Sequence, residues 1–138
     1  MNKDGPIVIL DDDEDDIELY KTLLTDLGIR NNIMLFTNSE DMLNYVHEVN
    51  VKPFLIISDI NMPRSDGFQI RSIISSDQDL KKKCIPYIFI TTDASPRAVE
   101  ESYNLSVQGI FQKPSNYDEW KSMMTHIINY WTDCMAPR

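Results

Sequence analysis

Five short apolar runs alternate with segments of helical periodicity, and this alternation restricts the possible folds more than any other feature of the sequence. Each run is too short for a helix and rich in residues that favour strands. The predicted strands are Ile7–Leu10, Ile33–Phe36, Phe54–Ser58, Tyr87–Thr91 and a short one around Gln108–Gln112. Strands that alternate with helices in this way form a parallel sheet with helices on both faces. The sequence therefore predicts an α/β fold.

The segments between the strands carry residues that start and stop helices. Apolar side chains recur three and four residues apart in these segments, which predicts amphipathic helices. The residues expected to bound them are Gly28, Thr37, Asn38, Ser39, Gly67, Ser95, Pro96 and Asn116. The polar stretch Ser75–Lys83 is expected to be a connection, with Lys81–Lys83 as a solvated run of charge. The apolar stripe Trp120–Trp131 of the last helix is expected to be mostly core, with Trp131 partly outside.

Length and composition limit the class of protein. A chain of 138 residues with 42% hydrophobic residues is expected to form one domain, residues 1–138, without an output domain. The net charge of −9 argues against a surface for nucleic acid or for an anionic membrane. No run reaches transmembrane length and no signal peptide precedes the first strand, so a cytoplasmic protein is expected. Cys84 and Cys134 indicate free thiols rather than a disulfide framework.

The residues at the strand ends indicate where the chemistry lies. The stretch Phe54–Gly67 places Asp59 directly after a buried strand and before a tight loop. In open α/β sheets, ligands bind beyond the carboxyl ends of the strands. The polar residues expected to converge there are Asp11, Asp12, Thr37, Asp59, Thr91 and Lys113. The sequence thus predicts three carboxylates, a hydroxyl and an ammonium group at one edge of the sheet.

Three carboxylates so close together need a compensating charge. One pair at ~4 Å repels by about 4 kcal/mol at an effective dielectric constant of ~20. Either one carboxylate becomes protonated or a cation binds. Oxygen-only ligands with room for water favour Mg²⁺. A magnesium ion beside a lysine and a threonine is suited to holding a phosphoryl group, and one carboxylate could accept that group as an aspartyl phosphate.

Four stretches resemble, in order and spacing, the signature motifs of the receiver domain of two-component response regulators. They are IVILDDDEDD, LIISDINMPRSDG, FITTDAS and GIFQKPSN. The resemblance runs from about Pro6 to Trp131 and is to the single-domain, chemotaxis-regulator-like type. It implies a flavodoxin-like, doubly wound (βα)5 fold with a five-stranded parallel sheet in the order 2-1-3-4-5. It also implies a role in phosphorelay signal transduction, with self-phosphorylation and autodephosphorylation rather than conventional enzyme activity.

The resemblance assigns roles to individual residues. Asp59 is the phospho-acceptor, and Thr91 and Lys113 contact the phosphoryl group. The Lys113–Pro114 peptide bond is expected to be cis. The expected magnesium ligands are Asp11, acting through a water, Asp12, Asp59 and the backbone carbonyl of Asn61. The phosphoryl donor would be a sensor histidine kinase, a phosphotransfer protein or a small acyl phosphate.

Two positions depart from the family pattern. Ile110 stands where the family often has an aromatic switch residue, and its inward movement is expected to be a smaller change than an aromatic side chain would make. Thr92 stands where a smaller residue is common, and it is expected to restrict access to the phosphoryl group. Asn61 and Asp93 each lie two residues past a key group, and both are expected to tune the rate of hydrolysis.

Two other functional classes fit parts of the sequence. A haloacid-dehalogenase-like phosphatase would use Asp11 as nucleophile and Asp13 as acid, but Asp15 stands where its motif needs threonine or valine. A calcium loop starting at Asp11 lacks the glycine and the bidentate glutamate that such a loop needs. Residues 13–16 are instead expected to begin a helix, whose dipole favours acidic side chains there. The remaining alternative is a docking module with the receiver fold that works without phosphorylation.

Output is expected through contact with another protein. The expected surface is formed by the helix after Ser95, the fifth strand and the last helix, because Thr91 and Lys113 begin the loops that lead into this region. The downstream target is not specified by the sequence. A phosphorylation-dependent homodimer is one expected form of this contact.

Overall fold

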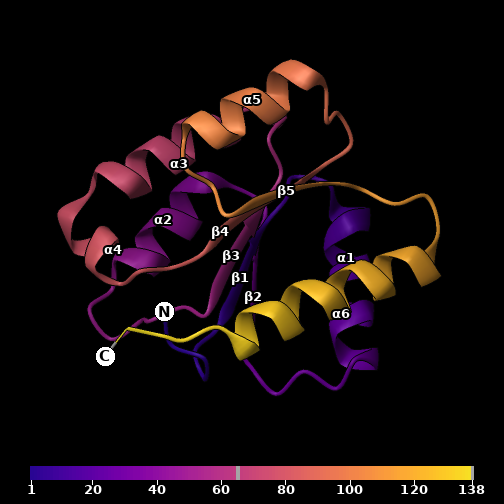
Figure 1. Ribbon diagram of the computed structural model, residues 1–138, viewed down its shortest axis with the longest axis horizontal. Coiled ribbons are helices and arrows are strands. Elements are labelled where there is room, and N and C mark those ends of the chain that lie inside the picture. Colours follow the sequence, from indigo (N-terminus) through magenta and orange to yellow (C-terminus); the bar gives the residue numbers. More distant parts are fainter. Residues whose placement is uncertain (65, 138) are drawn as a thin grey trace.

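The computed structural model, which describes residues 1–64 and 66–137, contains a five-stranded parallel sheet in the order β2-β1-β3-β4-β5 (Figure 1). The strands are β1 (Ile7–Leu10), β2 (Ile33–Phe36), β3 (Leu55–Ser58), β4 (Tyr87–Thr91) and β5 (Gly109–Gln112). The helices are α1 (Glu14–Asp26), α2 (Ser39–His47), α3 (Gly67–Ser76), α4 (Gln78–Lys82), α5 (Pro96–Asn104) and α6 (Tyr117–Asp133). The predicted doubly wound fold and its strand order are confirmed.

The sheet separates two apolar layers (Figure 1). Alternate residues of a strand point to opposite faces, so Ile7 and Ile9 of β1 enter one layer, while Val8 and Leu10 enter the other. The helical residues buried in the first layer come from α1 and α6 and include Tyr20, Leu24, Trp120 and Met124. Those in the second layer come from α2, α3 and α4 and include Met42, Val46, Ile70 and Leu80. The central strands are therefore buried on both faces and form a rigid support.

The register of the central strands brings their carboxyl ends together. Leu10 of β1 pairs with Ser58 of β3, so the residues that follow them leave the sheet at the same level. The backbone N–H of Asp59 donates to the Leu10 carbonyl at 3.0 Å. On the other side, the N–H of Lys113 donates to the Thr91 carbonyl at 2.8 Å. The backbone thus fixes the start of each functional segment at one edge of the sheet.

The predicted connection Ser75–Lys83 is largely helical, and this prediction was wrong. Helix α3 extends to Ser76, Asp77 caps the short helix α4, and Leu80 is buried. One buried apolar residue in a polar stretch gives no periodicity from which a helix could be predicted. Lys83 was also wrongly assigned to solvent, because its Nζ donates to three carbonyls near the end of α2. Their oxygens belong to Val46, Glu48 and Val51 and lie at 2.6, 2.9 and 2.8 Å.

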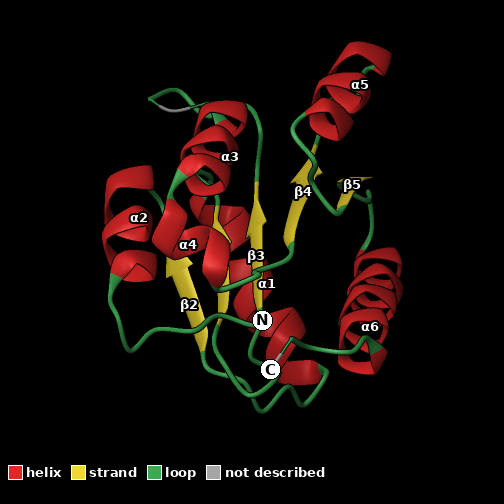
Figure 2. Ribbon diagram, turned by 60° about the vertical axis from the view of Figure 1, so that its left-hand side comes forward, coloured by secondary structure: helices red, strands yellow, loops and turns green. Residues whose placement is uncertain are grey.

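Helix α5 is attached mainly at its carboxyl end. Among its nine residues, all of them described, only Ser102 is fully buried. Arg71 of α3, which is itself buried, donates from Nε to the Leu105 carbonyl at 3.1 Å and from Nη2 to the Ser106 carbonyl at 2.9 Å. Figure 2 shows α5 at the margin of the molecule, beyond the carboxyl end of β4.

The same arginine connects α5 to the strands beside the site. Its guanidinium carbon lies 5.5 Å from the ring centroid of Tyr87 on β4. The Tyr87 hydroxyl forms a 2.8 Å hydrogen bond with Oγ of Ser58, the residue before Asp59. Burial raises the pKa of the Tyr87 hydroxyl, which is therefore protonated, and either hydroxyl can donate in this bond. Arg71, Tyr87 and Ser58 therefore join the end of α5 to the end of β3.

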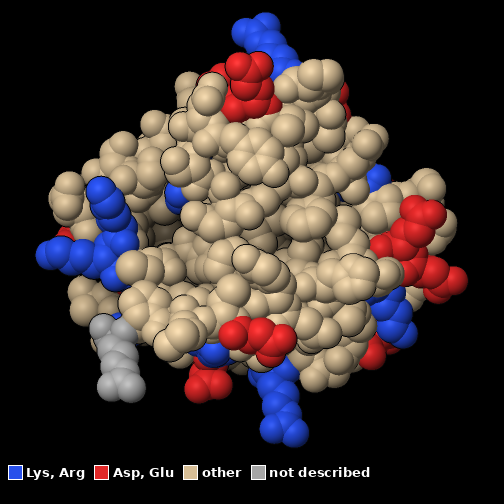
Figure 3. Space-filling model, in the orientation of Figure 1, with Lys and Arg blue, Asp and Glu red and all other residues tan. Residues whose placement is uncertain are grey.

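The apolar stripe of α6 is mostly core, as predicted. Trp120, Met124, Ile127 and Ile128 are buried, whereas Trp131 is only half-buried. Figure 3, in the same orientation as Figure 1, shows a mostly uncharged surface in the middle of this face, between α5 and α6, with charged side chains over α5 and toward the margins. Within the described residues, no helix combines the length and the apolar character needed to cross a bilayer.

Candidate functional site

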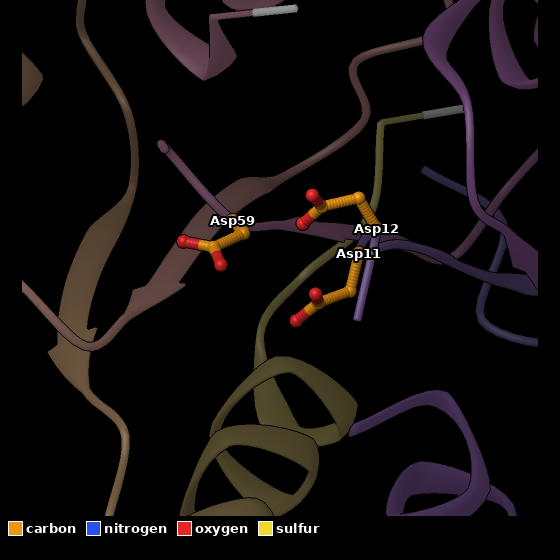
Figure 4. Close-up of side chains that lie close together, drawn as sticks. All are labelled: Asp11, Asp12 and Asp59. Atoms are coloured by element: carbon orange, nitrogen blue, oxygen red, sulfur yellow. The ribbon is translucent and has the colours of Figure 1, made fainter. Parts of the chain in front are cut away.

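Three carboxylates meet where β1 and β3 end. Asp11 and Asp12 follow β1, and Asp59 follows β3. One carboxylate oxygen from each lies within 4.8 Å of the others (Figure 4). Asp11 and Asp59 are buried, with exposed fractions of 1% and 7%, and Asp12 is half-buried at the margin. The structure thus brings together the three aspartates that were predicted to meet from their positions after the strands.

Lys113 supplies the positive charge at this site. Its Nζ lies 2.8 Å from Oδ2 of Asp11 and 3.0 Å from Oδ2 of Asp59. The lysine side chain is only 6% exposed. Burial lowers its pKa, but the hydrogen bonds to the surrounding carboxylates raise it more, so the pKa of Lys113 lies above its ordinary value and the group is an ammonium. The Lys113–Pro114 peptide bond is trans, so the expectation of a cis bond was wrong. With this bond in the trans form, the Lys113 side chain still reaches Asp11 and Asp59.

A third carboxylate, that of Asp16, also contacts this lysine. Its Oδ2 lies 2.6 Å from Nζ of Lys113, the shortest of the three contacts. From its position in the sequence, Asp16 is expected only to begin a helix. That part was right, because Asp13 caps α1 by accepting the backbone N–H groups of Asp15 and Asp16. Its position in the helix could have indicated this contact. Asp16 lies one turn before the buried Tyr20, at the border of the inward face of α1.

The aspartates remain short of positive charge despite the lysine. Burial raises the pKa of Asp11 to about 6, although hydrogen bonds from Lys113 and from the Asp13 backbone act in the opposite direction. The negative charge of Asp59 raises the pKa of Asp11 further. A divalent cation would relieve this repulsion and would keep both groups ionised.

The donor set fits a hard divalent cation. Carboxylate oxygens are the ligands that Mg²⁺ prefers, and at ~2.1 Å from the ion two opposite ligands are ~4.2 Å apart. The spread of 4.8 Å among the three oxygens is therefore close to what one ion requires. Asn61, the fourth expected ligand, is exposed and forms an isolated antiparallel bridge with Asp66. This bridge folds the loop after β3 back beside the aspartates.

The base of that loop is closed by Gly67. Its backbone N–H donates to the Ile60 carbonyl at 2.8 Å. A Cβ at this position would lie 2.4 Å from the Asp59 carbonyl oxygen. Ile60 in turn donates its N–H to Oδ1 of Asp59 at 2.7 Å. The glycine is therefore required for the backbone path that holds the Asp59 carboxylate in place.

Thr91 ends β4 with its side chain buried. Its Oγ1 has no hydrogen-bond partner within the part of the chain that the structure describes. A buried hydroxyl without a partner costs about 1–3 kcal/mol, so this atom is suited to bind an oxygen of a ligand. The next two residues, Thr92 and Asp93, are exposed. The structure therefore separates a buried hydroxyl from two side chains that face solvent.

A half-buried isoleucine, Ile110, stands at the position to which the resemblance assigns an aromatic switch residue. Ile110 packs against the layer of the core that contains α2 and α3, whereas Phe111 packs against the opposite layer. The two side chains thus point to opposite faces, as expected for neighbours in a strand. An aromatic side chain is therefore not available at position 110, and Phe111 does not replace it.

Comparison with known proteins places this arrangement in a defined family. The family model described as "Response regulator receiver domain" matches residues 7–125. Response regulator Rcp1 of Synechocystis sp. is 25% identical over 135 residues, which cover 94% of this chain and 90% of that protein. The crystal structure of the phosphorylated cyanobacterial phytochrome response regulator RcpA is similar with a TM-score of 0.85 and 23% identity, covering 97% of this chain and 99% of that one. The Mn²⁺-bound form of response regulator Rcp1 is similar with a TM-score of 0.81 and 24% identity, again covering 97% and 99%.

Proposed function

Because the chain belongs to the family of response regulator receiver domains, we propose that Asp59 is the residue that accepts the phosphoryl group. Members of this family interact with histidine kinases or phosphotransfer proteins, which are the proposed donors. The observation that carries the proposal is the position of the Asp59 carboxylate, buried next to Asp11 and held by Lys113 at 3.0 Å.

The proposed reaction is a displacement at phosphorus. An oxygen of the Asp59 carboxylate forms the new P–O bond while the P–N bond of a phosphohistidine breaks. The electron pair of that bond stays on the imidazole nitrogen, which then takes a proton from solvent. Both oxygens of Asp59 are oriented beforehand, Oδ1 by the Ile60 N–H at 2.7 Å and Oδ2 by Lys113. Lys113 also opposes the negative charge of the incoming group, and the buried hydroxyl of Thr91 is the proposed contact for one of its oxygens.

We propose Mg²⁺ as the ion of the aspartate cluster, held by Asp11, Asp12, Asp59 and the backbone carbonyl of Asn61. When bound, the ion supplies positive charge for the phosphoryl oxygens. The negative charges of Asp11 and Asp12 would hold the ion. When no ion is bound, Lys113 supplies positive charge to the cluster. The Mn²⁺-bound form of Rcp1 supports a divalent ion in this fold.

The test of the acceptor is direct. Wild-type protein is incubated with acetyl phosphate and Mg²⁺, and its intact mass is measured. We expect one phosphoryl adduct, which borohydride reduction and peptide mapping locate at Asp59. An adduct at another residue, or none, would contradict the proposed function.

Mg²⁺ is expected to stabilise the wild-type protein, and Asp12→Ala is expected to remove that effect. A ligand that binds the folded state at 100 times its Kd adds about 2.7 kcal/mol to the free energy of unfolding. Thermal melts with and without millimolar Mg²⁺ measure the shift. Asp15→Ala, which removes the same charge from an exposed residue, is the matched control and should keep the shift. If Mg²⁺ raised the melting temperature of Asp12→Ala as much as that of the wild type, Asp12 would not be a ligand of the metal ion.

Asn61 and Asp93 are proposed to set the rate at which the phosphorylated protein loses its phosphoryl group. Both line one open cavity of about 350 Å³ beside the site, so both are placed to affect an approaching water molecule. We expect substitution of either by alanine to change the lifetime severalfold while phosphorylation persists. The decay of phosphorylated protein after removal of the donor measures this. If the decay were unchanged in both variants, neither residue would set the rate, and Thr92 would be the residue expected to control access of water to the phosphoryl group.

A further inference from the structure

The ammonium group of Lys113 uses all of its donors on carboxylates. An ammonium has three N–H groups. Nζ of Lys113 lies 2.8 Å from Asp11, 2.6 Å from Asp16 and 3.0 Å from Asp59, each contact being to an Oδ2 atom. The three aspartates come from different segments: the end of β1, the first turn of α1 and the end of β3. The direction of each N–H is therefore set by a different part of the fold.

These three contacts change differently during the proposed reaction. The surroundings of Asp59 change most, because one of its oxygens becomes bonded to phosphorus. Asp11 is shared with the proposed metal site. Asp16 is not the acceptor, and it is not one of the three aspartates of the proposed metal site. Its position is fixed by the capped first turn of α1. The contact with Asp16 is thus available before and after phosphorylation.

We propose that Asp16 is a positioning residue for Lys113. Together with Asp11 it fixes two N–H directions of the ammonium, so that the third faces the acceptor carboxylate and then an oxygen of the phosphoryl group. This inference rests on the proposed function of Asp59. A free lysine side chain loses rotamer entropy when it is ordered, and a side chain already held in place loses none of it during the reaction.

The alternative role for Asp16 is electrostatic and predicts the opposite result. Another negative charge near Asp59 repels an anionic phosphoryl donor, so if repulsion were its main effect, removing the charge would accelerate phosphorylation. Positioning predicts a slower reaction, because Lys113 would have to be ordered anew in each turnover. The sign of the rate change therefore separates the two roles.

The kinetic test compares Asp16→Ala and Asp16→Asn with the wild type at saturating acetyl phosphate and Mg²⁺. We expect Asp16→Ala to slow phosphorylation of Asp59 about tenfold, the change that corresponds to ~1.4 kcal/mol in activation free energy. Asp16→Asn should slow it less, because an amide oxygen still accepts an N–H of Lys113. Asp15→Ala removes an equal charge one residue away and should react like the wild type. Thermal melts of each variant show that it is folded.

Two further measurements separate positioning from a general structural role. In the background Lys113→Met, Asp16→Ala should have no additional effect, because Asp16 acts through the lysine. In metal-free protein, acetic anhydride should modify Lys113 faster in Asp16→Ala than in the wild type, with the exposed Lys21 as internal reference.

The outcomes distinguish this inference from the proposed function. Wild-type protein that takes up no phosphoryl group would contradict the proposed function itself. Wild-type protein that is phosphorylated, together with Asp16→Ala that reacts equally fast or faster, would overturn only the role of Asp16. An undiminished effect of Asp16→Ala in the Lys113→Met background would overturn it as well.

Discussion

Asp59→Asn is expected to abolish phosphorylation by acetyl phosphate while the protein stays folded. An amide has nearly the shape of a carboxylate but is a far weaker nucleophile, so the site should be preserved and the reaction lost. The substitution also removes one negative charge from a cluster in which burial and the charge of Asp59 raise the pKa of Asp11. Thermal stability should therefore be unchanged or higher. Intact mass after incubation with Mg²⁺ and the donor gives the first result, and a thermal melt gives the second.

Asp79→Asn is the matched control for this experiment. Asp79 lies on α4, is exposed and is not among the residues of the cluster, so its variant should be phosphorylated like the wild type. A phosphoryl adduct of undiminished amount in Asp59→Asn would assign the acceptor to a different residue. A large loss of thermal stability in that variant would instead show that the carboxylate of Asp59 holds the fold together.

Gly67→Ala is expected to destabilise the protein and to disturb the acceptor at the same time. The new Cβ would lie 2.4 Å from the carbonyl oxygen of Asp59 and 2.8 Å from Cα of Ile60. Both atoms belong to the backbone directly after β3, so they cannot move aside without shifting Asp59. Overpacking of this kind costs about 1–3 kcal/mol of stability. We expect a melting temperature lower by several degrees and slower phosphorylation in the fraction that remains folded.

Gly109→Ala supplies the comparison for this glycine. A Cβ there meets the ring of Phe111, a side chain, at 3.2 Å, so a small adjustment of that ring can accommodate it. Its melting temperature should stay close to that of the wild type. Equal stability of Gly67→Ala and the wild type would mean that the loop after β3 has room for a side chain, contrary to the distances of 2.4 and 2.8 Å to its backbone.

The sequence was sufficient to predict the sheet and the meeting of its aspartates, because both follow from local patterns. A run of four apolar residues such as Ile7–Leu10 specifies a buried strand, and the residue after each strand must lie at the carboxyl edge. Asp11 and Asp59 were found in this way. The prediction needed no knowledge of how any side chain is oriented.

The contacts of long side chains were beyond such patterns. Lys113 reaches Asp16 across 97 residues, and Lys83 reaches the end of α2 across 32 to 37 residues. Neither contact leaves a periodic trace, because the ammonium ends a flexible chain whose direction depends on packing. Polar residues at a helix start have a sufficient local explanation, and for Asp16 that explanation concealed a second role.

The attachment of α5 gives it the mechanics of a lever. Its nine residues span ~14 Å at 1.5 Å per residue, and the bonds from Arg71 hold the end that lies farther from Thr91. The other end follows the loop that Thr91 begins, and its first turn is capped within the helix, where Oγ of Ser95 accepts the N–H of Ala98. A rotation of ~10° about the held end would carry Pro96 by roughly 2 Å, given the rise of 1.5 Å per residue. The arginine is therefore the fulcrum, and a rotation about it would displace the end of α5 near Thr91 while the sheet stays in place.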